Sequence, residues 1–178
     1  KPRASSPNNA RSRIGKAIAQ VKIAGLGNLP DGQRLAVNIS APGITLPASA
    51  EPVFISAKGT FGVGFVIDQG DSLAYVTTGD MEAAGLSLEE LYRIGINNLA
   101  TLIDSHEKGL RLTPIKDGAN GLLLDGHFEA SLVLLDHVWE GPLREYAQHA
   151  PIVVIPSRDV CAFCDTGSPT GVAVLRGV

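Results

Sequence analysis

The sequence predicts an α+β fold, a single domain with a largely antiparallel, mixed sheet and helices packed on it. Segments with helical periodicity and β-prone runs follow one another in mixed order, without βαβ repetition or an internal repeat. The 178 residues, 44% of them hydrophobic, suffice for one domain with a substantial core. No apolar run approaches the roughly 18 residues that a membrane span needs, so we expect no membrane partner.

The N-terminal third is predicted to hold a tail, a helix and short extended pieces. Residues 1–10 are rich in Ser, Pro and Asn and have nothing to bury, which predicts a disordered basic tail before a domain over 11–178. Prolines exclude long helices between Asn28 and Ala57. Gly25 would end the preceding helix, which is predicted from apolar residues at helical spacing: Ile14, Ala17, Ile18, Val21 and Ala24.

The middle of the chain shows clear local signals. Two β-prone runs in "FGVGFVIDQGDSLAYVT" surround residues 68–71 and predict an antiparallel hairpin. A short helical segment from about Asp80 should end at Gly85. A long amphipathic helix should follow, because Ser87 and Glu90 have the spacing of a capping box and apolar residues continue to Ile103.

The last third is predicted to contain two hairpins and two helices, with a further short helix over "LREYAQHA". Residues 110–124 give two short strands around a turn at 117–121. "PIVVIP" and "DVCAFC" give two more strands joined by a turn at 156–159, and Ser168 should cap a final helix. Between the hairpins, one helix ending at Gly141 is predicted from the spacing of Phe128, Leu132, Leu135 and Trp139.

Three spaced blocks also occur in a characteristic order. They are "VIDQGDSLAYVTTGDMEAAGLSLEELYRIGINNLA", "DGHFEAS" and "VVIPSRDVCAFCD". Together they resemble the YtpQ-like family of bacterial proteins, a domain of unknown function, over about residues 52–178. The resemblance implies an α+β domain and brings no assigned reaction, cofactor or catalytic residue, so we expect no bound cofactor.

Charge is distributed unevenly along the chain. Six of the 15 basic residues lie in the first 30 positions, which contain no acid, whereas all 18 acidic residues lie beyond them. An acidic body argues against a nucleic-acid groove and leaves the basic residues of 1–22 as the only segment expected to contact nucleic acid. "KPRASSPNNARSR" lacks the apolar core of a signal peptide and there are only two cysteines, which favours a cytoplasmic location.

The two cysteines, Cys161 and Cys164, form a C-x-x-C spacing within a predicted strand. Residues three apart on a strand point to opposite faces, so the two thiolates could not share a metal. No second C-x-x-C or H-x-x-x-H pair completes a zinc site, and the helix start of a thioredoxin-like pair does not follow. We interpret both as small core or edge residues and predict no metal.

An acidic segment offers candidate ligands, because Asp125, His127, Glu129, Asp136 and His137 lie close together in the sequence. Their spacing fits no recognised metal-binding pattern. We predict instead that Asp125 caps the following helix and that Glu129 lies in its positively polarised first turn, with the other three in water.

The turn "PSRD" supplies two further candidates. Arg158 is predicted to clamp a carboxylate or backbone carbonyl of its own chain, with contact to an anionic ligand or partner as the alternative. Asp159 is expected to fix the turn through its carboxylate. Asp165 begins a D-T-G triplet like that of aspartic proteases, but the triplet occurs once and little chain follows, so we interpret it as a capped turn.

No catalytic constellation emerges from these motifs. We therefore predict a non-catalytic binding or interaction domain for a protein or small ligand, with no catalytic residue. The candidate binding residues are Asp125, Glu129, Arg158 and Asp159. The alternative is an enzyme of unrecognised type, such as a metal-assisted hydrolase that uses the acids from Asp125 to Asp136.

Overall fold

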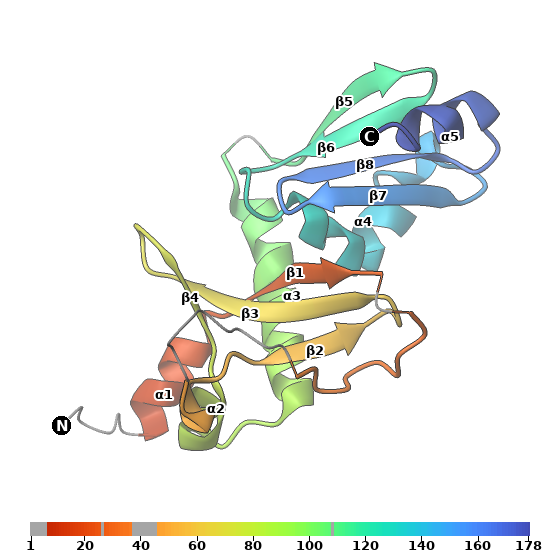
Figure 1. Ribbon diagram of the computed structural model, residues 1–178. Coiled ribbons are helices and arrows are strands. Elements are labelled where there is room, and N and C mark those ends of the chain that lie inside the picture. The colour runs from red at the N-terminus through yellow and green to blue at the C-terminus, as the bar shows by residue number, and fades with distance from the viewer. Residues whose placement is uncertain (1–6, 26, 37–45, 108) are drawn as a thin grey trace. The chain divides into compact units, whose positions relative to one another are not determined.

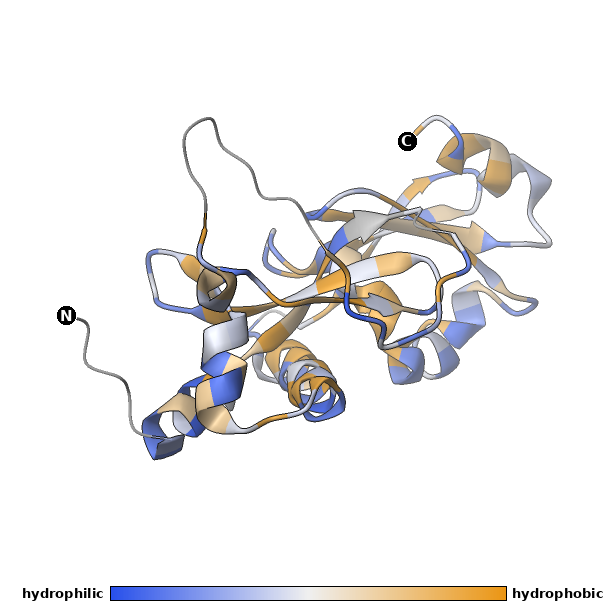
Figure 2. Cartoon of the chain, turned by 60° about the horizontal axis from the view of Figure 1, so that its bottom comes forward, coloured by the Kyte–Doolittle hydropathy of each residue, from blue (hydrophilic) through white to orange (hydrophobic). Residues whose placement is uncertain are grey.

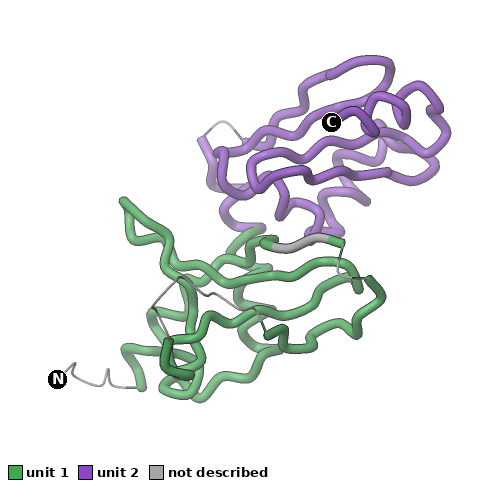
Figure 3. The backbone as a smooth tube through the Cα atoms, in the orientation of Figure 1, with its two compact units in different colours: residues 1–99 green, residues 100–178 purple. Residues whose placement is uncertain are grey.

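A computed structural model describes residues 7–25, 27–36, 46–107 and 109–178 (Figure 1). The chain divides into two compact units, residues 1–99 and 100–178 (Figure 3). Each unit contains one four-stranded antiparallel sheet together with helices, so the predicted α+β class is confirmed. The single domain over 11–178 stays a prediction. No helix among the described residues has the length and apolar character of a bilayer span.

The sheet of unit 1 is built around β3 (Phe61–Asp68), whose residues are buried except at its two ends. Along one edge β3 pairs with β1 (Ile18–Ala24), and along the other with β2 (Phe54–Ala57) and β4 (Leu73–Tyr75). The predicted β3–β4 hairpin is confirmed, and its turn contains Gly70 in the left-handed region (φ 89°). A short 3-10 helix, η1 (Ala48–Ala50), precedes β2.

The predicted helix from Ile14 to Ala24 is wrong. Helix α1 (Pro7–Ile14) ends at Ile14 and β1 follows. Three successive residues of β1, Ala19, Gln20 and Val21, are all buried, so the strand is covered on both faces and lacks the alternation that identifies a strand in sequence. Helix α1 also begins inside the predicted tail, of which residues 1–6 lie outside the described part.

The next two helices confirm their predicted ends. Helix α2 (Thr78–Ala84) stops at Gly85, which is left-handed (φ 61°). Helix α3 (Leu88–Ser105) starts with the predicted capping box, in which Glu90 N donates to Ser87 Oγ (3.2 Å) and Ser87 N donates to Glu90 Oε2 (2.8 Å). Figure 2 shows α3 with one apolar and one polar face, as the sequence pattern predicts.

The sheet of unit 2 has the strand order β5-β6-β8-β7, and all three pairings are antiparallel. The hairpin of β5 (Arg111–Lys116) and β6 (Ala119–Leu123) turns at Asp117 and Gly118, both with positive φ, as a two-residue turn requires. The hairpin of β7 (Pro151–Ser157) and β8 (Val160–Asp165) has the predicted turn. Both predicted hairpins are therefore confirmed, but the turn predicted at 117–121 is shorter, because residues 119–121 belong to β6.

The single helix predicted over Phe128 to Trp139 is wrong. The chain forms a 3-10 helix, η2 (Glu129–Leu134), and then α4 (Asp136–Glu140), with Leu135 extended between them (φ -102°, ψ 91°). Four consecutive residues from Glu129 are buried, so η2 has no exposed face, and Ala130 N donates to the Arg158 carbonyl of the β7–β8 turn (3.0 Å). This hydrogen bond to the β7–β8 turn stabilises η2 in place of the single regular helix that was predicted. Another 3-10 helix, η3 (Arg144–Tyr146), precedes β7.

Strand β8 is covered on both faces. Helix α5 (Pro169–Leu175), capped by Ser168 as predicted, packs with Leu175 against Ala162 and Cys164. On the alternate side-chain positions, Phe163 meets Trp139 edge-to-face, with ring centroids 5.4 Å apart. The core of unit 2 therefore lies around β8.

Candidate functional site

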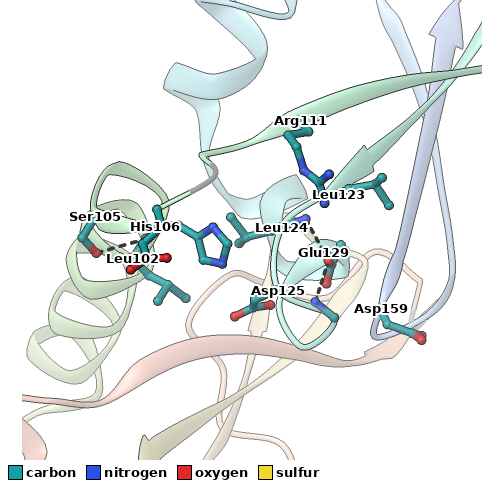
Figure 4. A pocket seen from close by; sticks show the side chains of 11 residues that line it. Leu102, Ser105, His106, Arg111, Leu123, Leu124, Asp125, Glu129 and Asp159 are labelled. Carbon is teal, nitrogen blue, oxygen red and sulfur yellow. Dashed lines mark hydrogen bonds between the residues drawn. The ribbon is translucent and has the colours of Figure 1, made fainter.

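A pocket of about 790 Å³ lies in unit 2, between the end of α3, the start of β5, the loop after β6 and the β7–β8 turn (Figure 4). Three apolar side chains contribute to its wall: Leu102, Leu123 and Leu124. Its ionisable lining consists of His106, Glu107, Arg111, Asp125, Glu129 and Asp159. The structure thus brings three of the four predicted binding residues together, all except Arg158.

Glu129 is the most unusual of these side chains, because it is only 2% exposed. Its Oε1 accepts the backbone N–H groups of Leu124 (2.9 Å) and Gly126 (2.8 Å). Its Oε2 is buried and has no hydrogen-bond partner among the described residues. The prediction of an ordinary acid in the first turn of a helix is therefore incomplete, since the side chain folds back onto the preceding loop and lacks one partner.

Asp125 stabilises the second half of the same loop, at residues 127–128. Its Oδ1 accepts the backbone N–H groups of His127 (2.8 Å) and Phe128 (3.1 Å). The predicted helix cap is therefore wrong in position: Phe128 occupies the N-cap of η2 and makes no capping side-chain bond, whereas Asp125 fixes the turn before it. Two carboxylates thus satisfy four amides of residues 124–128, and Gly126 provides the left-handed conformation (φ 83°).

The two candidate residues of the β7–β8 turn, Arg158 and Asp159, differ in the contacts of their side chains. Asp159 lines the pocket and accepts a hydrogen bond from the Ser157 hydroxyl (2.6 Å), which is the main reason that its pKa lies below the ordinary value. Arg158 is exposed, and the described part of the chain offers its guanidinium no hydrogen bond or ion pair. The predicted clamp has no support among the described residues and stays a prediction, whereas the backbone carbonyl of Arg158 accepts Ala130 N (3.0 Å).

Two pocket residues, His106 and Arg111, were missed by sequence analysis. Figure 4 shows their side chains extending toward the loop that carries Leu124. Arg111 starts β5 and pairs in register with Leu123 at the end of β6, which places it beside that loop. The one available signal was hairpin register, since the two-residue turn at 117–118 sets which residues of β5 and β6 are opposite.

The cysteines lie on opposite faces of β8, as predicted, and both are free and buried. Cys164 belongs to the cluster under α5, whereas Cys161 is close enough to Glu129 for its charge to act on the thiol. Burial, assisted by Glu129, raises the pKa of Cys161 to about 12. Burial also raises the pKa of Cys164, so both residues are neutral thiols at physiological pH.

The D-T-G segment forms the predicted capped turn. Asp165 Oδ1 accepts Gly167 N (2.6 Å), and its Oδ2 accepts His149 N (3.0 Å). The imidazole Nδ1 of His149 lies 2.9 Å from Asp165 Oδ1. These contacts lower the pKa of Asp165, with the backbone N–H of His149 as the largest cause.

Among the described residues, no three His, Cys, Asp or Glu side chains lie in positions that could hold a metal ion. Asp136 and His137, which completed the acidic segment in the sequence, are exposed on α4 and do not line the pocket.

A second pocket, of about 610 Å³, lies in unit 1 beside the start of α3. Its buried polar side chain, Ser56, accepts Gln33 N (3.1 Å) and donates to the Pro30 carbonyl. Since this hydroxyl is already satisfied, the pocket presents a weaker binding signal than the one beside Glu129.

Comparisons with models of protein families, with curated proteins and with solved structures found no match to this chain. Membership of the YtpQ-like family therefore stays a prediction. The candidate site rests on its own geometry.

Proposed function

We propose that the protein is a non-catalytic, cytoplasmic binding module that holds a small ligand in the pocket beside Glu129. One observation carries this proposal: Glu129 lines the pocket, and one oxygen of its buried carboxylate has no partner in the described structure. Leaving a buried acceptor unsatisfied costs about 1–3 kcal/mol, and more for a charged group. Because nearly all buried polar groups in native proteins are paired, a ligand donor is the natural partner for this oxygen.

Three other polar groups of the pocket favour binding over catalysis. Asp125 is committed to two backbone amides and Asp159 to the Ser157 hydroxyl. The hydroxyl of Ser105, a pocket residue, donates to the Leu102 carbonyl of its own helix (3.3 Å) instead of to a base. The alternative of a metal-assisted hydrolase gains no support from Asp136, which lies outside the pocket lining.

The proposal is tested by NMR titration of the isotope-labelled protein with three compounds that share a five-carbon chain. Diaminopentane is cationic, pentanedioate is anionic and pentanediol is neutral. We expect at least one of them to shift the amide signals of Leu124 and Gly126, which bond to Glu129, without shifting that of Gly118 in the β5–β6 turn. If none of the three moves those two signals, the proposed binding function is contradicted.

A further inference from the structure

The partner that Glu129 lacks has a definite chemistry. An ionised carboxylate only accepts hydrogen bonds, and Oε1 already accepts two of them. The remaining oxygen, Oε2, is buried and lacks a donor in the described part of the chain. The complementary ligand group is therefore an N–H or O–H donor, and a positively charged donor would form the stronger, charge-assisted bond.

Charge around the pocket favours the cationic donor. Among the described residues, four carboxylates line it, and Arg111 is the one lining guanidinium. The Ser157 hydroxyl donates a hydrogen bond to Asp159 (2.6 Å) and lowers the pKa of that carboxyl, which favours its charged form. A cleft lined mainly by one sign of charge concentrates ligands of the opposite sign. An anionic ligand would meet this excess of negative charge.

The pocket also has a hydrocarbon wall and room for an organic molecule. Leu102, Leu123 and Leu124 line it, and its volume of about 790 Å³ falls in the range of small-molecule sites. We propose, on the basis of the binding function above, that the ligand is a small organic cation, an aliphatic amine or guanidinium compound. Its N–H groups bond to Glu129, and its carbon chain lies on the three leucines.

Isothermal titration calorimetry with the same three five-carbon compounds tests this inference. We expect diaminopentane to bind more tightly than pentanediol and pentanedioate. Glu129→Gln should weaken diaminopentane binding at least about tenfold, because it removes one charge-assisted hydrogen bond. The matched control Glu140→Gln changes an exposed acid of α4 outside the pocket lining and should leave the affinity unchanged.

The outcomes separate this inference from the proposed function. Tighter binding of pentanedioate or pentanediol would overturn the amine assignment and leave the binding function standing. Equal diaminopentane affinity in wild type and Glu129→Gln would also overturn the assignment. No heat and no NMR shift with any of the compounds would overturn the binding function itself.

Arg111→Gln provides a second variant in case Glu129→Gln does not fold. Arg111 is exposed, so its replacement should preserve the fold, and it removes a positive charge from the pocket lining. Diaminopentane binding should become about twofold tighter, a modest gain because exposed charges are screened by salt. Unchanged or weaker diaminopentane binding would contradict the inference.

Discussion

Glu129 reaches back five residues to accept the backbone N–H of Leu124 at 2.9 Å. The same oxygen accepts Gly126 N at 2.8 Å, so one atom of this carboxylate holds the loop while the other is left without a described partner. A single side chain thus links the local structure of residues 124–129 to the binding capacity of the pocket. The two roles can be separated by substitution.

Glu129→Ala should lower the free energy of unfolding by about 2–3 kcal/mol, because both loop amides lose a charged acceptor. Glu129→Gln should cost less, since its amide oxygen can still accept Leu124 N and Gly126 N. Urea unfolding of the two variants beside Glu140→Gln, which should stay within about 0.5 kcal/mol of wild type, checks both values. Equal losses in Ala and Gln would show that the Oε1 bonds do not support the loop.

Asp165 should make stability depend on pH in the acid range. Its folded pKa lies below the ordinary value of 3.8, chiefly because it accepts the backbone N–H groups of His149 and Gly167. Its contribution is therefore fully present above pH 3.8 and is lost as the pH falls through the lower folded pKa. Urea unfolding from about pH 5 to about pH 2 should show a smaller acid loss in Asp165→Asn than in wild type. Parallel curves would contradict this role.

Neither cysteine should react with a thiol reagent in the native protein. Both are buried, and the pKa of Cys161 is raised to about 12, so almost no thiolate is present or accessible at neutral pH. Ellman's reagent should detect both thiols only after denaturation. Rapid native labelling would refute the assignment to the core.

The pair Cys161→Val and Cys164→Ala should also keep the fold, because small apolar residues replace two buried thiols without shared chemistry. Circular dichroism and elemental analysis of this double variant check the point. A stoichiometric zinc ion in the wild type that disappears together with the fold would refute the prediction.

Gly95→Ala should destabilise the protein although alanine is the better helix former. A Cβ at this position of α3 would approach Phe65 Cδ1 to 2.8 Å and Ala19 N to 3.0 Å. The resulting overpacking costs about 1–3 kcal/mol, which exceeds the gain in helix propensity of about 1 kcal/mol. A higher melting temperature of the variant would mean that α3 does not need this close approach to β1 and β3.

Elements governed by local chemistry could be predicted from the sequence. Ser87 and Glu90 specify the start of α3, and Gly85 ends α2 wherever these helices pack. Strand β1 and helix η2 could not be predicted, because consecutive residues in both are buried all round and show no decisive periodicity. Their conformations depend on tertiary partners, such as the bond from Ala130 N to the Arg158 carbonyl.

The candidate site was predictable by residue type and only partly by position. Asp125, Glu129 and Asp159 come together in the pocket because two turns meet there, whereas Arg158 remains outside its lining. The burial of Glu129 could not be predicted, since an acid early in a helix normally remains in water. Arg111 joins the site through the register of the β5–β6 hairpin, which places it opposite Leu123.

The most direct test of a ligand site at Glu129 is native mass spectrometry of wild type, Glu129→Gln and Glu140→Gln. Each protein is incubated with the small-molecule fraction of a cell extract and then desalted. We predict that wild type and Glu140→Gln retain one additional small mass per chain and that Glu129→Gln is detected at its bare mass. Wild type at its bare mass, or the same adduct on Glu129→Gln, would contradict the proposed site.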